Sequence, residues 1–437
     1  MSNRRTFLQR AIALGGGLLA APRLFAQHQH HDVPATPRPQ RGTRAPAAAS
    51  APLVQTPDVP NLPYRLDNGV KEFHLTAEVV ERELIPGRKM KVWGYNGSCP
   101  GPTIQVNQGD RVRVILDNHL PEPTTMHWHG FEIPLAMDGM PYISQKPIPP
   151  GGRFVYEFTL RQEGTYFYHA HGAMQEMMGM IGMFIMHPAK PYAPRVDHDF
   201  GITLQGWALL PNSDVPNTAG MEFNWLTLNG KAGPATTPLL VRHGSRVRIR
   251  LVNLGMDHHP IHLHGHTFSV TGTEAGRQPQ ALWGTGNTVL VGVAQARDVE
   301  FVADNPGDWM LHCHLPHHMM NSMMDLMGER MITTSALTPT QAGEQMQLMT
   351  ATGIPMSHGA HAQTAADPNR VPGFPQDAYM EMPMDEGVDK PENYGLAKNW
   401  SAGMMGMMTL VRVLPPDKYD HIMHLVAERD AKKGGRA

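Results

Sequence analysis

An internal repeat constrains the fold of this chain more than any other feature of its sequence. Three segments of the first half recur in the second half with similar residue types and almost constant spacing. They are Gly109–Val114 with Gly244–Ile249 and His127–Gly130 with His262–Gly265, both 135 residues apart, and Gly164–His171 with Gly307–His314, 143 residues apart. Such self-similarity indicates two homologous domains. We place them at about residues 64–190 and 195–335, which leaves no room for a third copy between them.

Both copies have the sequence pattern of β-strands. Residues 111–116, 154–158 and 246–251 alternate with a period near two, and Gly-Pro turn signals at 100–102 and 149–152 lie between such stretches. The chain holds 43 Gly and 39 Pro, and 17% of its residues are charged, which suits a turn-rich β protein. These features predict an all-β fold of two tandem β-sandwich domains.

The residues before the first domain indicate export. Asn3–Leu8 resembles a twin-arginine signal, and the apolar run Ala11–Ala21 is too short to span a bilayer. We expect a signal peptide over residues 1–26 and a periplasmic or other extracytoplasmic location. Residues 27–63 are rich in Pro and Ala and predict a disordered linker. No later stretch reaches membrane-span length, and the net charge of −2 implies no nucleic-acid partner.

The second domain carries the ligand types of a blue-copper electron-transfer site. Such a site uses a Cys thiolate, two His and a long axial Met. Cys313, His318 and Met323 supply three of these ligands within a short stretch. The chain has only two Cys, so a Cys99–Cys313 disulfide is an alternative use of this thiol.

The repeat restricts this site to the second domain. Four residues have the types that the site needs, and each has a counterpart in the first domain. The pairs are His259 with Thr124, Cys313 with Ala170, His318 with Gln175 and Met323 with Met180. The first domain therefore lacks the Cys and both His, and we expect one blue-copper site per chain.

Four His-x-His pairs accompany this site at matched positions of the two domains. They are His127 with His129, His169 with His171, His262 with His264, and His312 with His314. Residues i and i+2 of a strand share a face, about 6.5–7 Å apart, so each pair presents two imidazoles on one side. Neighbours of Cys313 on a strand point away from it and must bind a different metal. Eight imidazoles suit a cluster of three coppers.

Together these motifs resemble those of the multicopper oxidases over about residues 64–335. The resemblance implies cupredoxin-like Greek-key sandwiches and four coppers per active unit. It implies a type 1 copper on His259, Cys313, His318 and Met323, and a type 2 copper on His127 and His262. It assigns a type 3 copper pair to His129, His169, His171, His264, His312 and His314.

The spacing of the motifs is similar to that of the two-domain multicopper oxidases. The residues between His171 and His259 suffice only to begin the second domain, whereas a whole domain separates these motifs in three-domain laccases. In that family the trinuclear cluster lies between subunits of a homotrimer, so we expect a homotrimer. The resemblance also places Asp138 where an acid relays protons near the cluster. Asp138-Gly139 is also a good turn pair, which is the alternative interpretation of this acid.

The function implied by the resemblance is oxidation of a small reductant coupled to reduction of O2 to water. Two reductants stay open, namely Cu(I) in copper tolerance and phenols or aromatic amines as in laccases. The 31 Met favour Cu(I), because thioethers are soft ligands, and Met319, Met320 and Met324 follow the blue-copper Cys. Gap filling in the core is the alternative role of these Met. A copper nitrite reductase and a non-enzymatic copper-binding protein rank lower, because neither needs all four His pairs.

Residues 336–437 are interpreted as a linker and a Met-rich C-terminal extension. The sequence predicts a strand at 409–414 and a helix from 415, with Tyr419, Ile422 and Val426 on one face. This extension is expected to pack on a sandwich, to shield an edge strand or to bring Cu(I) to the type 1 site.

Overall fold

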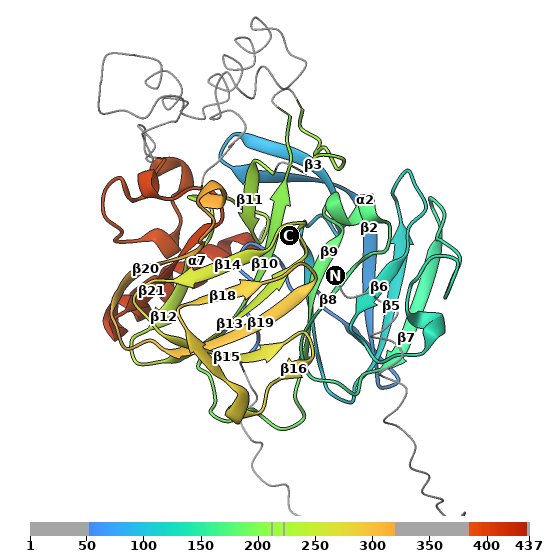
Figure 1. Ribbon diagram of the computed structural model, residues 1–437, viewed down its shortest axis with the longest axis horizontal. Coiled ribbons are helices and arrows are strands. Elements are labelled where there is room, and N and C mark those ends of the chain that lie inside the picture. Colours follow the sequence, from blue (N-terminus) through green and yellow to red (C-terminus); the bar gives the residue numbers. More distant parts are fainter. Residues whose placement is uncertain (1–51, 211–212, 222, 320–383, 435–437) are drawn as a thin grey trace, which may run out of the picture. The chain divides into compact units, whose positions relative to one another are not determined.

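The first sandwich uses residues 65–187 (Figure 1). The structure, a computed structural model, describes residues 52–210, 213–221, 223–319 and 384–434. One sheet has the strand order β1-β2-β5-β7 with β3 on β2, and the other has the order β4-β9-β8-β6. The strands are β1 Arg65–Asp67, β2 Val70–Ile85, β3 Arg88–Tyr95, β4 Gly101–Asn107, β5 Arg111–Asn118, β6 Met126–His129, β7 Arg153–Thr159, β8 Gly164–Ala170 and β9 Ile181–His187.

The core of this sandwich follows from the period-two pattern of its strands. Val112, Val114 and Leu116 of β5 are fully buried, while their neighbours along the strand are not. They share one apolar cluster with Trp128 of β6 and Phe184 of β9, which belong to the other sheet. The alternation expected at 111–116 and 154–158 therefore corresponds to β5 and β7.

The second sandwich begins at β10 and takes its last strand from the C-terminal part of the chain. One sheet has the order β11-β10-β13-β19-β15-β16 with β17 on β15, and the other has the order β12-β21-β20-β14-β18. The strands are β10 His198–Trp207, β11 Trp225–Leu228, β12 Leu239–Arg242, β13 Arg246–Asn253, β14 His259–Leu263, β15 Phe268–Thr273, β16 Gly276–Arg277, β17 Gly284–Gly286, β18 Thr288–Val291, β19 Gln295–Val302, β20 Gly307–Cys313 and β21 Met408–Leu414.

Strand β21 is the one expected at 409–414, and it lies inside a sheet. It pairs in parallel with β12 and antiparallel with β20, and Figure 1 labels it between these two strands. The second sandwich thus includes residues beyond position 335, because both neighbours of β21 belong to it. The strand does not shield an edge, since it has a partner on each side.

Among the described residues, helices are few and short apart from the last one. They are η1 Leu135–Met137, α2 Ala173–Met177, η2 Gln280–Leu282, η3 Pro316–Met319, η4 Glu386–Val388, η5 Pro391–Asn393, η6 Trp400–Gly403 and α7 Pro416–Gly434. The helix expected from residue 415 is α7, whose Ile422 is fully buried against Leu240 and Leu414. Within the described residues, no helix has the length and apolar character needed to cross a membrane.

A buried polar network joins the two sandwiches. Arg250 of β13 donates hydrogen bonds to Asp199 at 2.7 Å and to Thr165 at 2.7 Å. Thr165 belongs to β8 of the first sandwich and donates to Asp298 of β19 at 2.7 Å. All four residues are buried, so removing one charged partner would cost about 3–5 kcal/mol.

Candidate metal centres

Three of the side chains predicted to bind the type 1 copper meet in the second sandwich. His259 begins β14, Cys313 ends β20 and His318 lies in η3. The Sγ of Cys313 lies 3.7 Å from Nδ1 of His259 and 3.4 Å from Nδ1 of His318. The two Nδ1 atoms are 3.1 Å apart. Two nitrogens and one sulfur therefore converge on one point.

The chemistry of this donor set fits a copper ion. All three side chains are buried, and burial lowers the pKa of His259 to about 3 and that of His318 to about 4. Both rings are therefore neutral near pH 7, as metal ligands must be. Burial also raises the pKa of the Cys313 thiol to about 12. The thiol therefore keeps its proton near pH 7 until a bound metal ion displaces it. A thiolate with two imidazoles is typical of blue-copper sites.

Met323, the fourth predicted ligand, lies outside the described residues. Met320 and Met324 also lie outside them, whereas Met319 ends η3. The alternative pairing of Cys313 with Cys99 is not present, because both thiols are free and buried.

The first histidine group consists of His127, His129, His169 and His171, around the ends of β6 and β8. Ring centroids of the other three lie 5.6, 5.2 and 5.3 Å from that of His127. Nδ1 of His129 is 3.3 Å from Nε2 of His169. Burial lowers the pKa of His129 to about 4 and that of His169 to about 3, so both imidazoles are neutral.

The second histidine group repeats this arrangement with His262, His264, His312 and His314, on and after β14 and β20. Ring centroids of the other three lie 4.8, 5.6 and 5.4 Å from that of His262. Nε2 of His264 is 3.0 Å from Nε2 of His312. Three histidines of each group could share a metal ion, since their ligand atoms lie within 4.8 Å of one another.

The two groups differ in the partners that hold their first histidine. Nδ1 of His127 donates to the backbone carbonyl of Asp138 at 2.8 Å and lies 3.5 Å from the Asp138 carboxylate. Nδ1 of His262 lies 2.7 Å from the carbonyl of Asn287 and 3.0 Å from the hydroxyl of Thr288. A carboxylate thus stands beside one group where a hydroxyl stands beside the other.

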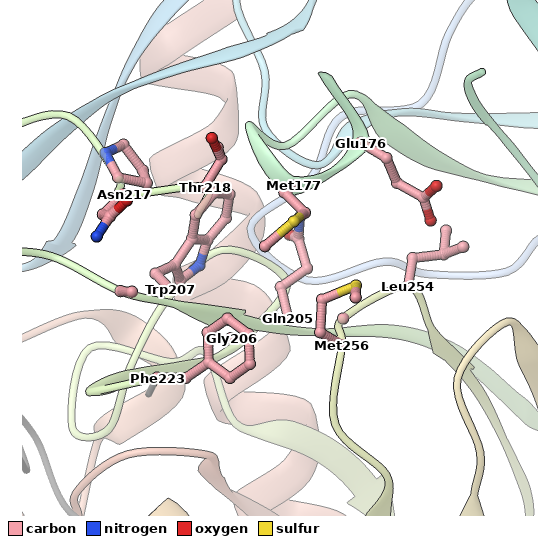
Figure 2. A pocket seen from close by; sticks show the side chains of 13 residues that line it. Glu176, Met177, Gln205, Gly206, Trp207, Asn217, Thr218, Phe223, Leu254 and Met256 are labelled. Carbon is pink, nitrogen blue, oxygen red and sulfur yellow. The ribbon is translucent and has the colours of Figure 1, made fainter. Parts of the chain in front are cut away.

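Glu176 is a site residue that the sequence analysis missed. It lies in α2, and its Oε2 is 3.4 Å from Nδ1 of His169. Burial raises its pKa to about 7. Figure 2 shows its carboxylate beside a small pocket that Met177, Leu254 and Met256 also line. The sequence shows an acid shortly after His169 and His171, but only the folded chain shows that it contacts His169.

A cluster of thioethers packs on the face of β20 and β21 opposite the Cys313 thiol and approaches that site through Met319. Met404 and Met408 are buried and pack with Leu410, and the half-buried Met310 and Met319 pack against them. Met319 directly follows His318, so the cluster adjoins a residue whose Nδ1 faces Cys313. Residues 404–408 lead into β21 and are far in sequence from Met310 and Met319. The contact therefore could not be expected from the sequence.

Two sequence profiles described as Multicopper oxidase match residues 77–191 and 210–330. The chain is 37% identical to Copper resistance protein A of Pseudomonas syringae pv. tomato over 123 residues, which are 28% of this chain and 20% of that protein. It is 29% identical to Laccase-2 of Botryotinia fuckeliana over 304 residues, 62% of this chain and 51% of that protein. The matches thus span about a fifth to a half of these relatives.

Solved structures resemble the chain over a larger share of their length. The Blue Copper Oxidase from Nitrosomonas europaea is 33% identical, with a TM-score of 0.53 over 57% of this chain and 81% of that one. Multicopper Oxidase mgLAC is 33% identical, with a TM-score of 0.54 over 58% of this chain and 82% of that one. The predicted all-β, cupredoxin-like fold is therefore confirmed.

Proposed function

Since this chain belongs to the multicopper oxidase family of oxidoreductases, we propose that it oxidises a small reductant and passes the electrons to O2. Membership implies copper as the cofactor. When bound, copper supplies one-electron redox chemistry at a type 1 site and four-electron reduction of O2 to water at a trinuclear cluster. We assign the type 1 site to His259, Cys313 and His318, together with an axial thioether.

One observation carries this proposal, namely the alternation along the end of β20. Cys313 faces His259 and His318, while the preceding His312 faces His262 and His264. Adjacent residues of a strand point to opposite faces. One strand end therefore belongs to both ligand sets, and the peptide backbone between Cys313 and His312 provides a covalent route for electrons from one site to the other.

The trinuclear cluster is proposed to take its ligands from the two histidine groups. We assign His127 and His262 to the type 2 copper and the remaining six histidines to the type 3 pair, as the family resemblance implies. Asp138 is proposed to relay protons, because its carboxylate lies 3.5 Å from His127 and is partly exposed to solvent. The side chain can therefore exchange protons with water and stay close to the group.

We propose a homotrimer in which each cluster combines the first group of one subunit with the second group of its neighbour. Within the described residues, ring contacts join histidines of the same group, and none joins one group to the other. His314 is exposed, and His127, His171, His262 and His264 are only half-buried. Each group alone is thus an open half-site that a second subunit would complete.

Complementation between subunits tests this arrangement. His129→Ala disables the first group and His264→Ala the second, so each variant alone is expected to be inactive. Co-expressed in equal amounts, they are expected to recover about a quarter of the wild-type activity, because every mixed trimer contains one intact pair of half-sites. The proposal would be contradicted if light scattering showed that the active protein is a monomer, or if isolated mixed trimers recovered no oxidase activity.

Cu(I) is the reductant that we favour, in a role in copper tolerance. The thioether cluster of Met310, Met319, Met404 and Met408 adjoins the proposed type 1 site, and thioethers favour Cu(I). One relative is named for copper resistance. The alternative is a laccase-like oxidase of phenols and aromatic amines, in agreement with another relative's name; in that case the same methionines only fill the core.

Oxygen uptake by the copper-loaded protein decides between the two reductants. Rapid uptake with Cu(I) and little with a phenol such as 2,6-dimethoxyphenol supports the metal oxidase, and the reverse supports the laccase. Nitrite reduction without oxygen uptake would instead indicate a copper nitrite reductase. Binding of many coppers with neither activity would indicate a copper-binding protein and would overturn the assignment of both histidine groups.

Export by the twin-arginine route is part of the proposal, although residues 1–26 lie outside the described residues. Cell fractionation of wild type and of an Arg4→Lys, Arg5→Lys variant tests it. The wild type is expected outside the cytoplasm and the variant inside.

A further inference from the structure

The backbone of Met407 is hydrogen-bonded to two residues of the proposed type 1 site. The amide of Cys313 donates to the carbonyl of Met407 at 3.0 Å, and the amide of Met407 donates to the carbonyl of His318 at 2.9 Å. The side chain of Met407 is fully buried and belongs to the same apolar cluster as Cys313. Residue 407 is thus held at the site, although it lies far from Cys313 in sequence.

Strand register places the Met407 side chain on the same face as the Cys313 thiol. In the β20–β21 ladder, Leu311 pairs with Thr409 and His312 with Met408. The next pair in this register is Cys313 with Met407. Directly opposed residues of antiparallel strands point to one face, with Cβ atoms about 4.5–5.5 Å apart. Met408 points the other way and packs in the thioether cluster.

The first sandwich contains the same local arrangement around Met180. Three backbone hydrogen bonds recur there at equivalent residues. They are Ala170 N to Met180 O at 3.0 Å, Met180 N to Gln175 O at 3.2 Å and Ile181 N to Gly179 O at 2.8 Å, against Cys313 N to Met407 O at 3.0 Å, Met407 N to His318 O at 2.9 Å and Met408 N to Gly406 O at 2.9 Å. The glycine before each Met has a positive φ, +108° at Gly179 and +63° at Gly406.

The pairing of β9 with β4 and of β21 with β12 agrees with this correspondence. Ile104 pairs with Phe184 in the β4–β9 ladder, and Leu239 pairs with Val411 in the β12–β21 ladder. Residues of β9 and β21 therefore correspond at a spacing of 227, while those of β8 and β20 correspond at 143. The difference is an insertion of 84 residues between η3 and β21.

Met180 thus has two candidate counterparts. Sequence spacing selects Met323, whereas strand pairing on both sides selects Met407. Strand pairing is the stronger criterion, because it records which residue lies opposite Cys313 in the folded chain.

We propose that the thioether of Met407 is the fourth, axial ligand of the type 1 copper. This assignment rests on the type 1 site proposed above. The ligand then comes from the strand that closes the sandwich, and the 84-residue insertion separates it from the other ligands in sequence only. The axial donor tunes the reduction potential of such a site, so Met407 sets how readily electrons enter.

Three leucine variants test the assignment, with EPR spectra and the reduction potential of the blue copper as readouts. Met407→Leu is expected to keep the copper but to change the hyperfine pattern and raise the potential, because a site that loses its fourth donor favours the three-coordinate Cu(I) state over Cu(II). Met323→Leu is expected to leave both unchanged. Met180→Leu is the matched control, since Met180 occupies the equivalent position beside Ala170. A shifted potential in Met323→Leu with none in Met407→Leu would overturn the inference.

Met407→Gln separates ligation from packing. An amide oxygen is a harder donor than a thioether, so the potential is expected to fall in this variant and to rise in Met407→Leu. Shifts of the same sign in both variants would overturn ligation in favour of packing. If the wild-type protein binds no blue copper at all, the proposed function fails before this inference is reached, so the two failures are distinguishable.

Discussion

Thr124 and Gln175 occupy in the first sandwich the places that His259 and His318 occupy in the second. The hydroxyl of Thr124 donates to Oε1 of Gln175 at 2.7 Å, and Nε2 of Gln175 donates to the carbonyl of Pro123 at 2.8 Å. In the second sandwich two imidazole nitrogens face each other at 3.1 Å beside a thiol. At this position the first sandwich pairs its polar side chains with each other and with the backbone, whereas the second presents two imidazoles and a thiol that suit a metal ion.

This difference shows that the sandwich fold tolerates the site but does not require it. Three backbone hydrogen bonds around Ala170 recur around Cys313. In our proposal the difference in metal binding between the copies therefore comes from the side chains at these positions. Substitutions in the two sandwiches are expected to have effects that range from complete loss of function to a change of stability alone.

The largest effect is expected from Cys313→Ala, which gives the second sandwich the residue that the first has at position 170. Without the thiolate the blue absorbance and the oxidase activity should both vanish, because electrons no longer have an entry site. Absorption spectra and oxygen uptake measure this loss. Cys99→Ala is the matched control, since Cys99 is also fully buried and free. A colourless Cys99→Ala protein would contradict the assignment of Cys313 as the copper thiolate.

The opposite change is expected to create a site in the first sandwich. Thr124→His, Ala170→Cys and Gln175→His together place the missing ligands around Met180, which already has the position of an axial donor. The blue absorbance per chain should about double, because both sandwiches then hold the same ligand set. The two His substitutions without Ala170→Cys serve as the control and should add no blue colour. A folded, copper-loaded triple variant with unchanged blue absorbance would show that the backbone frames differ.

Much of the candidate site could be predicted from the sequence because its ligands follow local rules. A strand alternates its faces, so the sequence predicts that His312 and Cys313 bind different metal ions. The internal repeat then located His259 and His318 by comparison with Thr124 and Gln175. The structure brings these residues together, at 3.4 Å between Cys313 and His318 and at 3.1 Å between the two histidines.

The contacts that could not be predicted are those that join distant parts of the chain. Strand β21 pairs with β20 across a long insertion, and the spacing of residues within β21 carries no information about its partner. From the sequence alone, Met407 belongs to the C-terminal extension and is not expected to lie near Cys313. The contact of Glu176 with His169 depends on the turn of α2, which motif spacing does not fix.

An intermediate effect is expected from Asp138→Asn. Among the described residues, the carboxylate beside His127 has no counterpart in the second group, where the hydroxyl of Thr288 lies beside His262. If Asp138 relays protons, turnover should fall by roughly 10²-fold or more, with copper content and blue colour unchanged. Oxygen-uptake rates with saturating reductant measure this effect. Thr288→Val should lower turnover much less, and an equal loss in both variants would assign Asp138 a positioning role only.

The smallest effect, on stability alone, is expected from Gln175→Ala in the first sandwich. It leaves the buried Thr124 hydroxyl without Gln175 as its partner and removes the hydrogen bond to the Pro123 carbonyl, which should lower the free energy of unfolding by about 1–3 kcal/mol. Blue absorbance and oxygen uptake should stay at wild-type values, because the proposed type 1 ligands lie in the other sandwich. Chemical denaturation of the copper-free protein measures the change.

A double variant shows whether this stability difference comes from the polar pair. Thr124→Val combined with Gln175→Met removes the hydroxyl and the amide together, so much of the cost of an unsatisfied group should disappear. The double variant is therefore expected to be more stable than Gln175→Ala. If both proteins lose the same stability, packing volume and not hydrogen bonding keeps the first sandwich closed at this position. In that case the equivalence of Thr124–Gln175 with His259–His318 is one of backbone position alone.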